Sequence, residues 1–426
     1  MRHPLGLYLI LFTEFWERFS YYGMRSLLIV YMTRQLQFST RTAGLIYGLY
    51  TGLAYLTPMF GGYLADRFMG QRRALVLGGT LIAMGHLAMT VTALPFFFTA
   101  LSLLVLGTGF FKANTAVLVG TLYDDEDPRR EDGFSLFYLC INIGGVLAPI
   151  VCGTLVTHGH WHLGFGAAGL GMLGGLLVYL RYQSVLGEHG LRPQPRGAVL
   201  GQDAAPPLTL VQKHRIWALI ILALVGNVTL WAALSQAGSS MALFADRETN
   251  LTIAGLGWSL PASYMQAINP LFIMCGVPAF SLLWRALARR NCEPNAPQKF
   301  ILGLLLVACG FGVLIVAGYA VDHGAKVSMG WLVLASLFHT CGELCVSPVG
   351  LSLVTKLSPK QYASVLMGLW YASLALANWL GGELAARYDS LTKASLFLIP
   401  ALALVLTACL LGLLTRPLQR LMHGIR

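Results

Sequence analysis

Six charged residues lie inside long apolar segments of the chain, where charge is costly to bury. They are Glu14, Glu17, Arg18, Arg25, Lys112 and Glu343. An unpaired charge at the centre of a membrane helix costs roughly 2.5–3.5 kcal/mol, so six of them would exceed the stability of a whole domain. Because three are acidic and three are basic, they can pair or line a water-filled cavity. We therefore expect a functional site here in preference to simple links between helices.

The first apolar segment carries a regular polar stripe. Glu14, Glu17, Arg18, Tyr21 and Arg25 recur at intervals of three and four, which places them along one side of a helix. The rest of this helix is rich in Leu, Ile and Phe, so the stripe should face a cavity rather than lipid. An arginine keeps a neighbouring buried carboxylate ionised, and neutralising that arginine favours the protonated carboxyl. Such a site can carry a proton.

The elements that position these residues are predicted to be membrane helices. Of the 426 residues, 56% are hydrophobic and 11% are charged, against about 25% charged in a soluble domain. A membrane span uses about 20 residues. Twelve apolar segments cover approximately 5–33, 42–65, 74–93, 96–122, 134–156, 163–183, 215–240, 257–284, 300–320, 328–355, 362–386 and 394–415. The sequence thus predicts an all-α polytopic membrane protein with twelve transmembrane helices.

The longest interruption, residues 185–213, is rich in Gly, Pro and Gln and is typical of a linker. We expect it to be cytoplasmic and to join two six-helix bundles, an N-terminal one at 1–184 and a C-terminal one at 214–426. The other interruptions are too short to form a soluble domain.

The loop charges predict the orientation in the membrane. With both termini on one side, that side holds most of the 29 Lys and Arg residues, and the opposite side holds only Arg34, Arg41, Arg247, Lys326, Arg387 and Lys393. Basic loops stay in the cytoplasm, so both termini should be cytoplasmic. The net charge of +11 then reflects topology and does not indicate a nucleic-acid partner. Short outer loops favour a multi-pass protein of the bacterial cell inner membrane.

No pattern of residues suggests catalysis or metal binding. The eight cysteines have neither C-x-x-C nor zinc spacing, and no nucleophile elbow or P-loop is present. We therefore do not expect an enzyme, a metal site or an organic cofactor, and the proton would be the coupling ion. The protein is expected to be a monomer in the lipid bilayer.

Several motifs resemble those of known transporters. Gly61 to Arg73, GGYLADRFMGQRR, resembles the short-loop motif of the major facilitator superfamily, with Asp66 and Arg67 as gating residues. The matching place in the second half, PAFSLLWRALARRN, also ends a helix in a basic turn. Glu14 to Gly23, EFWERFSYYG, resembles the ExxERFxYYG motif of the proton-dependent oligopeptide transporter family. Further matches follow in order: FKANTAVLVGTLYDDEDPRREDGF from Phe111, FYLCINIGG from Phe137, NPLF from Asn269 and GELCVSPVGLSLVTKLSP from Gly342.

The resemblance implies a major facilitator fold and proton-coupled symport of di- and tripeptides by alternating access. Glu14, Glu17, Arg18 and Lys112 would couple transport to protons. The peptide would be bound by Tyr21, Tyr22, Arg25, Tyr55, Lys112, Tyr138, Asn142, Trp231, Asn269, Glu343, Ser347 and Trp370. Among these, Arg25 and Lys112 would receive its carboxylate and Glu343 its amino group. A basic pole, an acidic pole, amide partners and adaptable aromatic walls suit a site that accepts dipeptides of any sequence.

The chain departs from the family pattern at Ser235. Related sequences commonly carry a carboxylate there, one turn after the tryptophan that corresponds to Trp231, as the gating partner of the arginine at Arg25. We expect Arg25 to use Glu14, Glu343 or the substrate carboxylate instead. The linker also leaves no room for the two additional helices that many bacterial members insert.

Two other functions remain open at this point. One is a transporter of the same fold for another solute, such as nitrate, an amino acid or a drug, which the serine at position 235 favours. The other is a membrane sensor that binds peptide without transporting it. Competition between dipeptides and single amino acids distinguishes the first, and flux into vesicles distinguishes the second.

Overall fold

The computed structural model describes residues 3–124, 126–193, 208–253, 255, 257–359 and 362–423. The linker predicted at 185–213 therefore falls partly outside the described residues, at 194–207. The chain forms two compact units: one comprises Met1–Tyr31 and Leu53–Asp203, and the other Met32–Gly52 and Ala204–Arg426. The boundaries of the predicted bundles remain a prediction.

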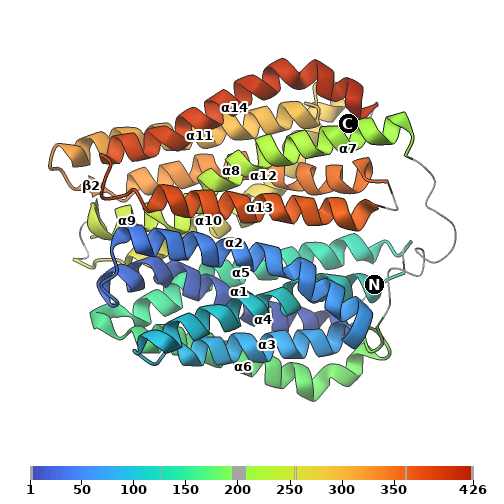
Figure 1. Cartoon of the computed structure of the whole chain (residues 1–426), viewed down its shortest axis with the longest axis horizontal. Coiled ribbons are helices and arrows are strands. Elements are labelled where there is room, and N and C mark those ends of the chain that lie inside the picture. The colour runs from blue at the N-terminus through green and yellow to red at the C-terminus, as the bar shows by residue number, and fades with distance from the viewer. Residues whose placement is uncertain are drawn as a thin grey trace. The chain divides into compact units, whose positions relative to one another are not determined.

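The first half of the chain is a series of long helices (Figure 1). They are α1 (Leu5–Arg34), α2 (Thr40–Leu64), the π-helical turn η1 (Ala65–Met69), α3 (Gln71–Ala88), α4 (Leu94–Thr121), α5 (Arg129–Leu155), the 3-10 turn η2 (Thr157–Gly159), α6 (Trp161–Tyr182) and the 3-10 turn η3 (Gln183–Leu186). Helix α3 packs against α4 and α6, with the aromatic rings of Phe97, Phe111 and Phe165 buried between helices of this unit.

The second half has more interruptions within its spans. The elements are α7 (Leu210–Ile221), η5 (Leu222–Asn227), α8 (Val228–Leu234), η6 (Ser235–Gly238), α9 (Ser240–Arg247), β1 (Thr249–Asn250), η7 (Ala262–Ala267), α10 (Ile268–Arg289), α11 (Ala296–Asp322), β2 (Val327–Ser328), α12 (Gly330–Leu357), α13 (Ala363–Ala385) and α14 (Lys393–Met422). Strands β1 and β2 pair in parallel, with Thr249 opposite Val327. Helix α11 lies along α14, and Figure 1 shows the two side by side.

The helix ends have identifiable local causes. Thr209 and Gln212 form a capping box that begins α7, and Asn295 and Gln298 form another that begins α11, so the first free N–H groups have acceptors. After α2, the backbone turns at Gly70 with a φ of 79°, a conformation that side-chain-bearing residues rarely adopt. The predicted segments and the observed helices agree within a few residues at most ends.

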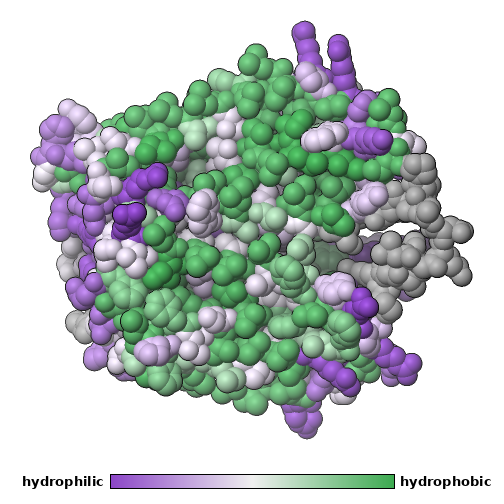
Figure 2. Space-filling view, in the orientation of Figure 1, coloured by the Kyte–Doolittle hydropathy of each residue, from purple (hydrophilic) through white to green (hydrophobic). Residues whose placement is uncertain are grey.

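The helices account for twelve spans. Nine helical segments in the described part of the chain are long and apolar enough to cross a membrane, counting α7 to α9 as one span and η7 with α10 as another. Helices α1, α2 and α3 complete the twelve. Helix α1 is not among the nine because it carries several charged residues. Figure 2 shows hydrophobic side chains along the middle of the visible helices and hydrophilic ones gathered toward their ends.

The start of α2 packs closely on α13 within the second unit, through glycines. A Cβ atom added to Gly48 would lie 2.7 Å from Gly382 Cα and 3.1 Å from the carbonyl oxygen of Trp379. Gly44 makes a similar approach to Ala386 and Gly382. Residues without side chains let two helix backbones come together, as is common between membrane helices.

Replacing Gly48 with valine should therefore destabilise the protein. Gly312→Val in α11 is the matched control, because nothing lies within 4 Å of a Cβ at that position. Overpacking costs about 1–3 kcal/mol, so Gly48→Val should melt below both the wild-type protein and Gly312→Val in thermal unfolding of the purified chain. Equal melting temperatures for the two variants would show that the close approach of α2 and α13 does not matter.

Candidate functional site

In the first unit, Arg18 is buried and shared between two carboxylates. Its Nε lies 3.0 Å from Glu14 Oε1, and its Nη2 forms an ion pair with Glu17 Oε2. The exposed fractions of Glu14, Glu17 and Arg18 are 2%, 0% and 5%. The i, i+3 and i+4 spacing on α1 brings the three groups together, as expected from the sequence.

This cluster has one more carboxylate than guanidinium. Glu14 Oε2 and Glu17 Oε1 are buried without a hydrogen-bond partner among the described residues. A buried charge without a hydrogen-bond donor is costly. A proton or a second cation is therefore needed to balance the charge here.

Lys112 of α4 is the nearby second cation. Its Nζ lies 4.1 Å from the centre of the Tyr55 ring, a cation–π contact, and its charge interacts with those of Glu17, Glu14 and Arg18. No carboxylate lies within 4.0 Å of Lys112 in the part of the chain that the structure describes. The ammonium therefore belongs to the electrostatic environment of the cluster without sharing a direct ion pair.

Other predicted residues of the first unit lie on the same or neighbouring helices. Arg18 also lies over the Tyr21 ring at 5.4 Å, and Tyr21 meets Tyr22 edge to face at 5.4 Å. Half-buried Arg25 comes two turns after Arg18 on α1. On α5, Asn142 is buried and donates to the carbonyl oxygen of exposed Tyr138 at 2.8 Å.

In the second unit, Glu343 of α12 is oriented by α10. The Asn269 Nδ2 group donates to Glu343 Oε2 at 3.1 Å and to Thr340 Oγ1 at 3.0 Å. Thr340 in turn donates to the carbonyl oxygen of Ser336. The sequence analysis missed Thr340, although its position one turn before Glu343 is a signal that could have found it. Asn269 thus links Glu343 to Thr340.

The remaining predicted residues of the second unit lie on α8, α12 and α13. Trp231 is half-buried on α8. Ser347 follows Glu343 by one turn, and its buried hydroxyl has no hydrogen-bond partner among the described residues. Trp370 is buried, and its ring lies where a side chain at Gly350 would otherwise fit. The structure thus brings the predicted residues together within each unit.

The short loop after α2 is anchored by Arg72, which was not among the site residues predicted from the sequence. Asp66 accepts a hydrogen bond from Gln71 at 2.8 Å, and Arg67 donates to the Tyr63 hydroxyl at 2.7 Å. Arg72 is buried and donates to the carbonyl oxygens of Gly187 and His189, at 2.5 and 2.6 Å. It therefore ties this loop to the segment after α6.

A set of ion pairs lies within the second unit near the start of α2. Arg34 binds Asp246 at 2.8 Å, and Arg247 binds Asp389 at 2.9 Å and the Thr40 hydroxyl at 3.2 Å. These contacts join the chain around the α1–α2 turn to α9 and to the turn after α13. The sequence analysis did not identify them because each pairs residues more than 100 positions apart.

Ser235, at the position where we noted the missing carboxylate, is packed against α13. It is 3% exposed, and its hydroxyl donates to the carbonyl oxygen of Ala232 at 2.8 Å. A Cβ atom at Gly381 would overlap the Ser235 hydroxyl oxygen. The position thus has no room for a longer side chain in this arrangement of helices.

Ser235→Glu should consequently reduce the melting temperature of the purified protein, because the larger side chain must displace α13 or bury a carboxylate against it. Ser235→Ala adds no volume and should melt close to the wild type. A glutamate variant as stable as wild type, with unchanged proton-driven uptake, would contradict both this packing and the idea that the serine changes gating.

Comparison with known proteins places the chain in a family. The family model described as "POT family" matches residues 72–202 and 208–402, more than half of the chain. The peptide transporter YePEPT of Yersinia enterocolitica is 35% identical, with 99% of this chain and 96% of that protein covered. Their alignment runs over 501 positions, so the relative has residues that this 426-residue chain lacks.

Two further proteins agree. A di-/tripeptide transporter of Lactococcus lactis is 31% identical, covering 99% of this chain and 97% of its own length. The crystal structure of a mutant peptide transporter POT in complex with alafosfalin superposes with a TM-score of 0.90 at 35% identity, covering 99% of this chain and 96% of the other. The chain therefore belongs to the POT family, a family of multi-pass membrane transporters, and has the twelve-helix fold of the major facilitator superfamily.

Proposed function

We propose that this protein is a proton-coupled symporter of di- and tripeptides that works by alternating access of two six-helix bundles. The observation that carries the proposal is the buried cluster in α1, where Glu14 and Glu17 share the single guanidinium of Arg18. The relatives from Yersinia and Lactococcus are named as peptide and di-/tripeptide transporters, which supports the same substrate class here.

The proton is the proposed coupling ion, and no metal or organic cofactor is required. A proton entering from outside neutralises Glu17 or Glu14. Arg18 and Lys112 are then less strongly held by the carboxylates and can bind the carboxylate of the peptide. Binding neutralises the basic pole, so the inward transition buries fewer unpaired charges. Release of the peptide on the inside returns the proton.

The two units supply opposite poles for a zwitterionic substrate. Arg25 and Lys112 attract its carboxylate, and Glu343, oriented by Asn269, attracts its amino group. The amides of Asn142 and Asn269 serve the peptide backbone, and the walls are formed by Tyr21, Tyr22, Tyr55, Tyr138, Trp231 and Trp370, with Ser347 beside Glu343. Only the two charged ends and the amide are common to all dipeptides, so this arrangement accepts many side chains.

The protein is proposed to act as a monomer in the bacterial cell inner membrane with both termini in the cytoplasm. The excess of Lys and Arg in loops on the side of the termini supports this orientation. Asp66 and Arg67, in the loop after α2, are proposed to act in gating on this side, and Ser235 on the outer side.

Uptake into proteoliposomes tests the proposal. Labelled dialanine should accumulate when the outside is acidic and should not accumulate without a pH gradient. Unlabelled dipeptides should compete, whereas alanine or nitrate should not. Competition by a single amino acid or by nitrate, without competition by dipeptides, would favour a transporter of another solute. The serine at position 235 supports that alternative. Peptide binding without flux would instead identify a sensor.

Glu17→Gln should reduce accumulation driven by the pH gradient at least about tenfold, because the amide cannot take up and release the proton. Counterflow exchange of dialanine should remain, since exchange does not require net proton movement. Glu131→Gln is the matched control, because Glu131 is exposed at the start of α5 and should behave as wild type. Accumulation by the Glu17 variant at the wild-type level would remove this residue from the coupling mechanism.

A further inference from the structure

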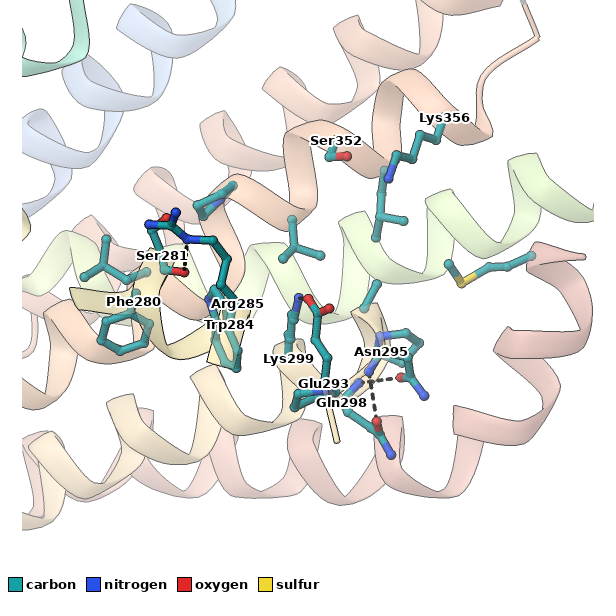
Figure 3. Close-up of a pocket in the computed structure, with 18 of the residues that line it drawn as sticks. Phe280, Ser281, Trp284, Arg285, Glu293, Asn295, Gln298, Lys299, Ser352 and Lys356 are labelled. Carbon is teal, nitrogen blue, oxygen red and sulfur yellow. Dashed lines mark hydrogen bonds and ion pairs between the residues drawn. The ribbon is translucent and has the colours of Figure 1, made fainter. Parts of the chain in front are cut away.

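A cavity of about 1040 Å³ lies in the second unit, and none of the residues proposed to bind protons and peptide lines it. Helices α10, α11 and α12 and the end of α14 line it, as Figure 3 shows for most of the lining residues. All of these elements meet at the end of the unit where α10, α12 and α14 finish and α11 begins. No part of the proposed transport mechanism uses this cavity.

The cavity is amphipathic along its length. Near the helix ends it is lined by Arg285, Lys299 and Lys356, and deeper in by Val277, Leu344 and Val349. Helix α12 lines it from Leu344 to Lys356, which is about 18 Å at the helical rise of 1.5 Å per residue. This distance is close to half of the roughly 30 Å hydrocarbon core of a bilayer. The distance from the basic end of the cavity to its apolar end thus matches the hydrocarbon thickness of one leaflet.

The charged end of the cavity has an excess of positive charge. Lys299 pairs with Glu293 at 2.7 Å and lies 4.8 Å above the Trp284 ring. Among the described residues, Arg285 donates to the carbonyl oxygen of Ser281 in its own helix, at 3.3 Å. Within the described ranges, no carboxylate lies within ion-pair distance of Arg285 or Lys356, and both side chains are exposed. These two cations therefore have no acidic partner among the described residues, and Figure 3 shows them on opposite sides of the drawn lining.

Helix α10, which forms one wall, is also the least covered of the apolar helices. Only 6% of its most apolar 18-residue window is buried, whereas the other eight spans reach 39% or more. Apolar side chains such as Leu282 and Leu283 remain exposed along it. This wall of the cavity therefore has little protein cover.

We propose that this cavity binds one anionic phospholipid. The phosphate of the headgroup lies between Arg285 and Lys356, whose exposed side chains reach it from opposite sides of the cavity (Figure 3), and an acyl chain fills the apolar depth beside Leu344. Basic pockets between transmembrane helices are suited to anionic headgroups. A soluble anion would use the cations but would leave the apolar depth empty, so the length and gradient favour a lipid. With the topology proposed above, the lipid comes from the cytoplasmic leaflet.

Native mass spectrometry of the purified full-length chain can test this inference, with phosphatidylglycerol and phosphatidylcholine offered together. The wild-type protein should retain phosphatidylglycerol preferentially. Each basic residue contributes about fivefold to binding an anionic lipid, so the double variant Arg285→Gln with Lys356→Gln should weaken retention by about twenty- to thirtyfold. The double variant Arg289→Gln with Arg290→Gln is the matched control, because these exposed arginines end the same helix outside the cavity lining.

Three outcomes would overturn the inference. Equal loss of phosphatidylglycerol in both double variants would indicate general attraction to a basic surface. Equal retention of phosphatidylcholine by the wild type would exclude headgroup recognition. Displacement of the lipid by glycerol phosphate as effectively as by phosphatidylglycerol would identify a site for a free anion. Because the readout is lipid binding, failure here leaves the proposed peptide transport untouched, and failure of transport leaves this result valid.

Discussion

The ion-pair cluster of Glu14, Glu17 and Arg18 is the interaction on which the account of this protein depends. Removing one partner from a buried ion pair is strongly destabilising, by about 3–5 kcal/mol, because it leaves a charge without compensation. Here a single guanidinium serves two carboxylates, so the cluster is structurally satisfied only in part. The missing positive charge makes the cluster costly to bury. A proton or the nearby ammonium of Lys112 can supply that charge.

The two units handle their buried acids in different ways. In the first, a guanidinium on the same helix holds the carboxylates, so a change of protonation alters the net charge of the cluster. In the second, the amide of Asn269 orients Glu343 from a neighbouring helix, and Thr340 fixes the direction of that amide. The Asn269 amide is a neutral donor, so this contact adds no charge. An acidic pole of this kind suits a cationic substrate group.

Local features could be predicted from the sequence, and long-range ones could not. The cluster in α1 followed from spacing within one helix, and most helix ends followed from the apolar pattern. The interruptions of α7 to α9 did not, because the apolar segment predicted at 215–240 runs through both η5 and η6. The approach of Gly48 to Gly382 and the bonds from Arg72 to Gly187 and His189 join distant positions, whose pairing a single sequence does not reveal. The packing of Ser235 against Gly381 likewise joins distant positions of the sequence.

The central claim is that peptide and proton cross the membrane together through the α1 cluster. The most direct measurement is the lumenal pH of proteoliposomes loaded with a pH-sensitive dye, after dialanine is added outside with no pH gradient imposed and the membrane potential clamped. If peptide and proton cross together, the lumen acidifies in proportion to the peptide that enters. Entry of the peptide with no change in lumenal pH would contradict coupled transport.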